Sequence, residues 1–83
     1  MKVQIKYFAS IRESVGSGAE SLETTAQTVA ALRDELIARG AGYAESLARG
    51  KAVRVAMNQT LSDESAALLD GAEVAFFPPV TGG

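Results

Sequence analysis

The sequence predicts an α+β fold in which one mixed β-sheet packs against one main α-helix. Two runs, residues 3–7 and residues 53–57, alternate apolar side chains with others in the way that a half-buried strand requires. Between these runs, residues 29–37 show the period of an amphipathic helix. The chain has 83 residues, which is enough for one domain with one compact core.

The first predicted elements are two strands separated by a helical turn. Residues 2–8 form the first strand, and Phe8 falls on the side opposite the buried positions. Residues 11–15 predict one short helical turn, which ends in a loop at residues 16–18, Gly-Ser-Gly. That loop lacks the Lys-Ser/Thr of a phosphate-binding loop, so a turn is the favoured interpretation. A weaker second strand fits residues 20–24.

The main helix is predicted from residues 29–37, whose apolar positions recur at helical spacing. Thr28 precedes them and can serve as the N-cap residue, because its hydroxyl can accept a hydrogen bond from a free backbone N–H. Glu35 and Arg39 are four residues apart and are expected to pair. Gly40 stands where a helix commonly ends in a left-handed conformation.

The second half of the chain predicts a loosely helical stretch and then a hairpin. Residues 43–47 form the helical stretch, and residues 53–57 form a third strand by their alternation. Asn58-Gln59 is a plausible tight turn, because Asn tolerates positive φ. A short strand is then expected at residues 60–61.

The last strand is predicted at residues 74–77, after a turn at Asp70-Gly71. Pro78-Pro79 ends it, because proline has no N–H to donate to a sheet. The order of elements, with one helix crossing after the first hairpin, predicts the β-grasp, or ubiquitin-like, arrangement, with four to five strands. In that arrangement the first and last strands lie side by side at the sheet centre. We therefore expect a β-grasp domain over residues 1–79.

The composition excludes most kinds of active site. The chain has no Cys and no His, the residues from which zinc, iron–sulfur and haem sites are mainly built. The same absence removes a thiol nucleophile, a disulfide framework and the side chain that titrates near neutrality. A domain this small also has little volume for a deep pocket. We expect no bound metal or cofactor and no catalysis by the chain alone.

Charge and hydropathy also restrict the partners. The net charge is −2, with both signs interspersed, so the chain has no basic patch for nucleic acid and no polybasic membrane segment. Its longest uninterrupted apolar stretches, residues 74–77 among them, have four residues and are far too short to span a bilayer. The first residues show neither the charged n-region nor the apolar h-region of a signal peptide, so none is expected. A soluble, cytoplasmic protein is expected.

The C-terminal segment is the feature most suited to chemistry. Residues 80–83 follow the rigid double proline and are expected to form a flexible tail that extends about 13 Å at about 3.3 Å per residue. Gly82 and Gly83 have no Cβ, so this end can enter a narrow channel in another protein. The reactive group that it would deliver there is the α-carboxylate of Gly83. An inert, frayed end is the alternative interpretation.

A free carboxylate is a poor electrophile, because attack on it would have to expel an oxide. Conversion to an anhydride such as an acyl-adenylate solves this difficulty and requires ATP and a second protein. The activated carbon can then be attacked by an amine, which gives a conjugate, or by a sulfur donor, which gives a thiocarboxylate.

Several segments of the chain carry a family resemblance. They are Tyr7-Phe8-Ala9 with Arg12-Glu13 and Gly16, Thr28-Val29 with Leu32, residues 56–61 (AMNQTL) and residues 69–83 (LDGAEVAFFPPVTGG). With these segments the chain resembles the small subunits of molybdopterin synthase, which are sulfur carriers related to the ubiquitin-like carriers of the thiamin pathway. The resemblance spans nearly the whole chain, and its last fifteen residues are the most specific part. One difference is Ala72, where the family more often has an acidic residue.

This resemblance implies a role for Gly83 as the sulfur-bearing residue, with Gly82 beside it. An adenylyltransferase similar to ubiquitin-activating enzymes would use ATP to adenylylate Gly83, and a sulfur donor system would make the thiocarboxylate. The tail would then enter the large subunit of the synthase, which holds the active site, and pass sulfur to cyclic pyranopterin monophosphate. The family also suggests a heterotetramer, with two small subunits flanking a large-subunit dimer.

The same resemblance implies a partner interface on the outer face of the sheet. Phe8 and Phe77 are both out of phase with the buried face of their strands, and Leu61 can join them. Exposed aromatic side chains often mark an interface, although a short loop that covers them is the alternative. Arg12 can pair with an acidic group of a partner. The remaining expected contacts are Pro78 and Pro79 at the end of the domain and Val80 and Thr81 in the tail.

Two other functions stay open from the residues alone. The chain could be a ubiquitin-like modifier whose Gly83 forms isopeptide bonds with lysines, or an interaction module whose tail is inert. A carrier could also serve a pathway other than that of molybdopterin. The carboxylate pairs Glu20 with Glu23 and Asp63 with Glu64 are expected to be solvated surface groups.

Overall fold

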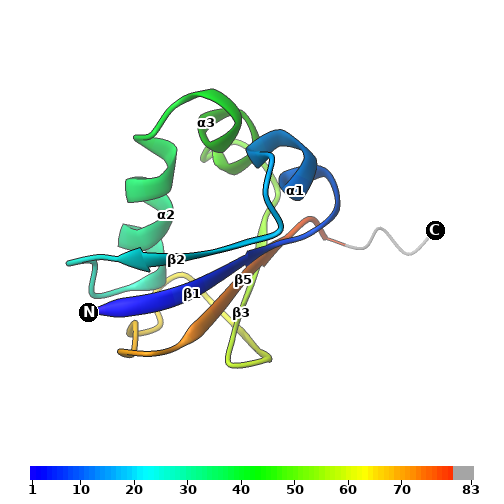
Figure 1. The fold of residues 1–83 in the computed structure, drawn as a ribbon. Helices are drawn as coiled ribbons and strands as arrows, with labels where there is room; N and C mark the ends of the chain where they lie inside the picture. Colours follow the sequence, from blue (N-terminus) through cyan, green and yellow to red (C-terminus); the bar gives the residue numbers. More distant parts are fainter. Residues whose placement is uncertain (80–83) are drawn as a thin grey trace.

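The computed structural model describes residues 1–79. It contains a five-stranded sheet and three helices, coloured along the sequence in Figure 1. The elements in chain order are β1 (Lys2–Tyr7), α1 (Ala9–Val15), β2 (Ala19–Glu23), α2 (Val29–Ile37), α3 (Ala41–Leu47), β3 (Arg54–Met57), β4 (Thr60–Ser62) and β5 (Glu73–Phe77).

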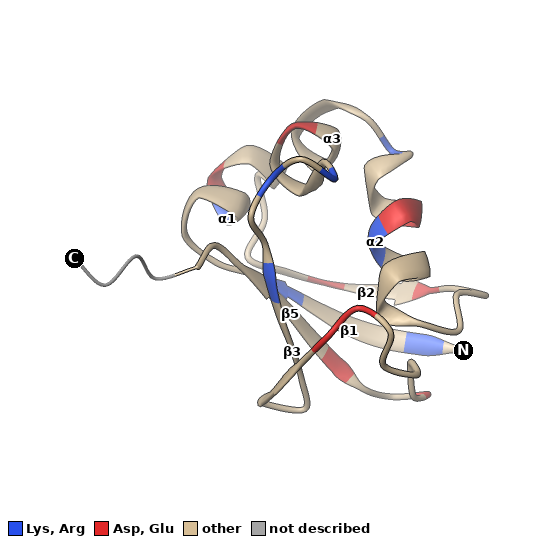
Figure 2. Cartoon of the chain, turned by 180° about the vertical axis from the view of Figure 1, so that it is seen from behind, with Lys and Arg blue, Asp and Glu red and all other residues tan. Residues whose placement is uncertain are grey.

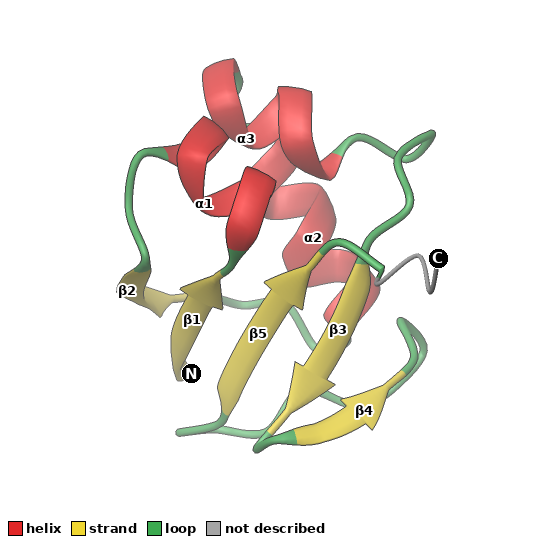
Figure 3. Cartoon of the chain, turned by 90° about the vertical axis from the view of Figure 1, so that its right-hand side faces the viewer, coloured by secondary structure: helices red, strands yellow, loops and turns green. Residues whose placement is uncertain are grey.

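The strand order is β2-β1-β5-β3-β4, with β1 and β5 parallel and all other neighbours antiparallel. The predicted β-grasp arrangement is confirmed, including the placement of the first and last strands side by side. Figure 3 shows the helices on one side of the sheet, while no helix or strand of residues 1–79 covers the other side. We call this uncovered side the open face.

The core lies between the sheet and α2. Val3 and Ile5 of β1 are fully buried, as are Leu32 and Leu36 of α2. Each buries an apolar side chain, which contributes about 1.5–3 kcal/mol. The alternation along β1 therefore fixes which face of the strand meets the helix.

The main helix begins and ends close to the predicted residues. The backbone N–H of Ala31 donates to the Thr28 hydroxyl, which confirms Thr28 as the N-cap residue. Gly40 lies three residues beyond the end of α2, and its φ of +76° with ψ of −163° is a positive-φ conformation that glycine adopts at low cost, but not the left-handed helical conformation predicted for it. The predicted Glu35–Arg39 pair is wrong. Glu35 instead accepts a hydrogen bond from the hydroxyl of Thr24, and Arg39 pairs with a carboxylate on β2.

The helices α1 and α3 pack against each other beside the C-terminal end of β1. The stretch predicted as loosely helical is a regular helix, α3. Gly42 lies directly against the backbone of α1, because a Cβ built on it would stand 1.7 Å from the carbonyl oxygen of Ser14. The contact therefore requires glycine at this position.

A buried arginine joins α2 to the end of α3. The Arg33 side chain is only 4% exposed, and it donates hydrogen bonds to the carbonyl oxygens of Leu47 and Ala48, both at 2.7 Å. It also pairs with Glu64 at 2.6 Å, and Arg49 binds the same carboxylate. The expectation that Glu64 is a solvated surface group is therefore wrong, because two guanidinium groups hold it.

Acidic and basic residues are interspersed over the elements, as Figure 2 shows. Within residues 1–79, no helix is long and apolar enough to cross a membrane, and no group of three or more acidic side chains is arranged to hold a metal ion.

Candidate functional site

The attachment point of the tail is the end of the central strand β5. This strand is hydrogen-bonded to β1 on one side and to β3 on the other. Val74 and Phe76 point into the core and are fully buried, and the Phe76 ring stacks on Tyr7 with centroids 6.4 Å apart. Pro78 and Pro79 follow at once and are half-buried. The end of β5 is thus held by hydrogen bonds to both neighbouring strands and by side chains that are buried in the core.

Four of the predicted site residues, Val80, Thr81, Gly82 and Gly83, lie outside the described residues. Their roles remain predictions. The geometry of the site accordingly rests on the end of β5 and on the surface around it.

The open face near that end is largely apolar. The strand register places Ala75, Ala56 and Leu61 in one row across β5, β3 and β4. Leu61 is 65% exposed, the most exposed large apolar side chain among the described residues. Phe77 points to the same side as Ala75, because alternate residues of a strand share a face, and it is half-buried. The prediction that Phe77 and Leu61 share the outer face agrees with this register.

Phe8 lies at the same end of the sheet. It follows β1 in an extended conformation and is the residue before helix α1. Its backbone N–H donates to the carbonyl oxygen of Phe76 at 3.1 Å, so the chain still follows β5 at this residue. Its side chain is 46% exposed, and the alternation of β1 directs it to the open face. We refer to Phe8, Leu61 and Phe77 together as the apolar patch.

Arg12 lies on α1 and is exposed. Its guanidinium is packed over the loop between α1 and β2, since a Cβ built on Gly18 would be 3.1 Å from the Arg12 Nε. No ion pair within residues 1–79 includes Arg12. Its role as a contact for an acidic group of a partner stays a prediction.

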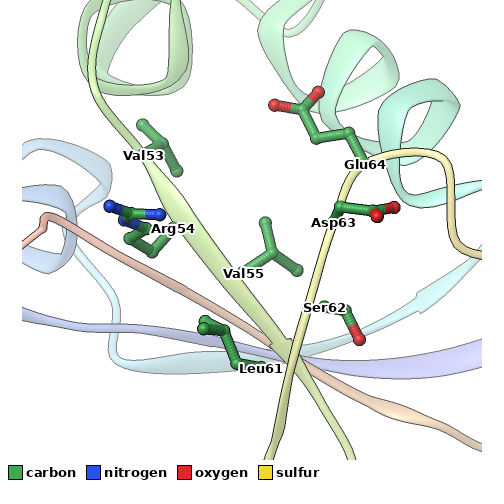
Figure 4. A pocket seen from close by; sticks show the side chains of 7 residues that line it. All are labelled: Val53, Arg54, Val55, Leu61, Ser62, Asp63 and Glu64. Carbon is green, nitrogen blue, oxygen red and sulfur yellow. The ribbon is translucent and has the colours of Figure 1, made fainter.

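A further cation, Arg54, borders the apolar patch and was not predicted as a site residue. It is the first residue of β3, it pairs in register with Phe77, and it is exposed. The alternation of Val53, Arg54 and Val55 could have revealed its outward position. Figure 4 shows Arg54 on one wall of a groove of about 410 Å³ between β3 and the chain that leaves β4.

On the side of the sheet that faces the helices, a polar network centred on Glu20 fixes the end of β1. The Glu20 carboxylate accepts hydrogen bonds from the Tyr7 hydroxyl at 2.9 Å and the Tyr43 hydroxyl at 2.7 Å, and it pairs with Arg39 at 2.8 Å. The interpretation of Glu20 as a solvated surface group is therefore wrong. Glu23, its predicted companion, is exposed.

The network changes the pKa values of its members. Burial raises the pKa of the Glu20 carboxyl, but the hydrogen bonds from Arg39, Tyr43 and Tyr7 outweigh burial, and the net pKa lies below 4.5. Burial and the hydrogen bond to Glu20 both raise the pKa of the Tyr7 hydroxyl far above its usual range. Glu20 therefore stays ionised and Tyr7 stays neutral at neutral pH, and the network is suited to holding structure rather than to moving protons.

Comparisons with known proteins agree with this geometry. The chain is 44% identical to the molybdopterin synthase sulfur carrier subunit of Escherichia coli over 81 residues, which cover 98% of this chain and 99% of that protein. Among solved structures, it resembles SAMP1 of Haloferax volcanii, a small archaeal modifier protein, with a TM-score of 0.77 and 26% identity over all of both chains.

A third likeness is to a chain in the complex of subunits 1 and 2 of the molybdopterin-converting factor of Helicobacter pylori. The TM-score is 0.70 and the identity is 27%, over the full length of both chains. Residues 5–83 match the ThiS family. This match covers nearly all of the described domain and also includes Gly82 and Gly83. The chain therefore belongs to the ThiS family.

Proposed function

We propose that this chain is the sulfur carrier subunit of a molybdopterin synthase. The observation that carries the proposal is the 44% identity to the Escherichia coli carrier subunit over nearly the full length of both chains. In this chain, Gly82-Gly83 follows the central strand β5, the double proline Pro78-Pro79 and two further residues, an order that supports a role in presenting the C-terminal carboxylate to a partner.

The working group in this proposal is the α-carboxylate of Gly83. Its oxygen attacks the α-phosphorus of ATP in the active site of an adenylyltransferase, which gives a glycyl-adenylate and releases pyrophosphate. A persulfide from a sulfur donor system then attacks the acyl carbon and expels AMP, which gives an acyl disulfide. A thiol of the donor system then attacks the donor-side sulfur of this acyl disulfide, so that the thiocarboxylate leaves with the electron pair of the S–S bond and the donor system is left with a disulfide. The ATP is bound by the activating enzyme and not by this chain.

The thiocarboxylate then donates its sulfur within the large subunit of the synthase. The substrate would be cyclic pyranopterin monophosphate, and two rounds would supply the two sulfur atoms of the dithiolene. Gly82 suits a narrow channel, because a backbone without Cβ atoms can pass where other residues collide. The active site lies in the partner, so the domain contributes binding and orientation. We place this chemistry in the cytoplasm, in a heterotetramer with two chains of each kind.

The open face supports the docking step. Within the apolar patch, Phe77 is the last residue of β5, Phe8 lies beside the end of β5, and Leu61 lies two strands away on β4, so a partner that covers the patch is positioned to receive the tail. The complex of subunits 1 and 2 from Helicobacter pylori is a precedent for pairing in a similar chain. We propose that Phe8, Leu61 and Phe77 contact the large subunit, with Arg12, Pro78, Pro79, Val80 and Thr81 as further contacts.

Reconstitution tests this function. The purified chain, loaded with its activating enzyme, ATP and a sulfur donor, is mixed with the large subunit and the pterin precursor, and dithiolene formation is measured. The proposal predicts product with the full chain and none after deletion of Gly83. Equal product from the full and the truncated chain would reject it.

The likeness to SAMP1 favours a second candidate, protein conjugation through Gly83. An isopeptide product would survive thiol reductant and strong denaturant, whereas a thiocarboxylate adds no protein mass. Denaturing gels of cells that express the tagged chain separate the two functions. Higher-mass bands that disappear when Gly82 and Gly83 are deleted would establish conjugation.

A further inference from the structure

We infer that Arg54 is a specificity-determining residue. It selects a partner whose surface, where it covers the open face, presents a carboxylate to the Arg54 guanidinium. This inference rests on the proposed function, because it takes the large subunit of the synthase as that partner. It adds a charge requirement to the interface that the apolar patch forms.

The first observation is the position of Arg54. The register pairs it with Phe77, the last residue of β5, so it stands beside the strand end from which the tail departs. It also lines the groove together with Leu61. A partner that contacts both Leu61 and Phe77 must therefore pass over the Arg54 side chain or lie directly against it.

The second observation is that Arg54 has no carboxylate partner within residues 1–79. Of the other four arginines, Arg33, Arg39 and Arg49 form ion pairs, and only Arg12, which lies on α1 rather than on the sheet, forms none within residues 1–79. Arg54 forms none in the same part of the chain, although it is exposed and lies on a strand held by neighbours on both sides.

The carboxylates across the groove are already engaged. Glu64 is bound by two guanidinium groups, and Asp63 accepts hydrogen bonds from the hydroxyl and the backbone N–H of Ser65. In Figure 4 the Arg54 guanidinium points away from both acidic side chains. Its charge is therefore not neutralised from within the described domain.

A partner that covers the apolar patch removes water from Arg54, and an unpaired guanidinium in a desolvated interface is costly. A carboxylate in the partner removes this cost, and the planar guanidinium can bind it with two parallel hydrogen bonds. Surfaces that lack the carboxylate are rejected by the same desolvation cost. The apolar patch would then supply affinity, and Arg54 would supply discrimination and the orientation of the tail.

Titration calorimetry with the large subunit tests this inference. The variants are Arg54→Gln and Arg54→Glu. The matched control is Lys2→Gln, which removes one exposed positive charge at the first residue of β1, the end of that strand farthest from Phe8. We expect Arg54→Gln to weaken binding about 30-fold or more and Arg54→Glu to weaken it further, with Lys2→Gln within about twofold of wild type. Melting temperatures should be unchanged, because Arg54 has no ion pair within the described domain to lose.

A charge exchange completes the test. Acidic surface residues of the large subunit are changed to Lys one at a time, and one of these variants should restore binding to Arg54→Glu. If wild type binds and Arg54→Glu binds within twofold of it, this inference is wrong and the proposed function stands. If wild type does not bind the large subunit at all, the proposed function fails and this inference fails with it.

Discussion

The backbone N–H of Phe8 donates to the carbonyl oxygen of Phe76 at 3.1 Å, one residue beyond the last paired position of β1 and β5. This bond brings an exposed aromatic residue from the start of the chain beside the final strand. The apolar patch and the base of the tail are therefore built on the same two central strands. Any partner that binds one is positioned to receive the other.

The neighbouring residues Phe76 and Phe77 should separate stability from binding. Phe76 is fully buried, so Phe76→Ala should lower the free energy of unfolding by about 3–5 kcal/mol. Phe77→Ala should weaken the complex with the large subunit by more than about 1 kcal/mol and leave the melting temperature nearly unchanged. Thermal unfolding and calorimetry measure the two effects. A stability loss for Phe77→Ala that equals its binding loss would assign Phe77 to the core.

The Glu20 network should make the domain sensitive to acid. The pKa of Glu20 in the folded state lies below its ordinary value of 4.5, so the carboxylate stabilises the fold above that pH. This contribution is lost as the pH falls through the folded pKa. Glu20→Gln should cost about 1–2 kcal/mol at pH 7, and the difference from wild type should shrink below about pH 4.5.

Urea unfolding of both proteins at a series of pH values measures this difference. Glu23→Gln is the control, since Glu23 is exposed and forms no ion pair among residues 1–79. A constant difference between wild type and Glu20→Gln from pH 7 to pH 3 would contradict the assigned role of the ionised carboxylate.

Arg33 and Arg49 bind the same carboxylate, that of Glu64, but should contribute different amounts to the free energy of unfolding. Arg33→Met leaves the carbonyl oxygens of Leu47 and Ala48 without their buried donor, so we expect a loss of about 2–3 kcal/mol. The Arg49 side chain is 46% exposed, and Arg49→Met should cost less than about 1 kcal/mol. Chemical denaturation compares them, and equal losses would show that burial of Arg33 is irrelevant to its contribution.

The contact between α1 and α3 should depend on Gly42. A methyl group there would collide with the Ser14 carbonyl oxygen, so Gly42→Ala should lower stability by about 1–3 kcal/mol, despite the higher helix propensity of alanine. Gly50→Ala is the matched control, because a Cβ at Gly50 meets no atom within 4 Å and should change stability by less than about 0.5 kcal/mol. The melting temperature should therefore fall in Gly42→Ala and stay close to that of wild type in Gly50→Ala.

The strands and the main helix could be predicted from sequence because their signals are local. Alternation along residues 3–7 and helical spacing along residues 29–37 each arise from neighbouring residues that meet one core. The outward position of Phe77 followed from the same alternation.

The polar networks could not be predicted, because their members are distant in sequence. Glu20 is 13 residues from Tyr7, 19 from Arg39 and 23 from Tyr43. The Glu35–Arg39 spacing offered a local pair, and the tertiary fold replaced it with a partner on another element. Helix spacing shows which residues can meet, and packing decides which of them do.

The most direct measurement is the mass of the C-terminal peptide. The intact chain is incubated with its activating enzyme, ATP and a sulfur donor, and the peptide that ends in Gly83 is analysed by mass spectrometry. Replacement of one carboxylate oxygen by sulfur predicts a gain of about 16 Da on Gly83, and omission of ATP should abolish it. An unchanged terminal peptide, in a reaction where a known carrier is converted, would contradict the role of Gly83 as a sulfur carrier.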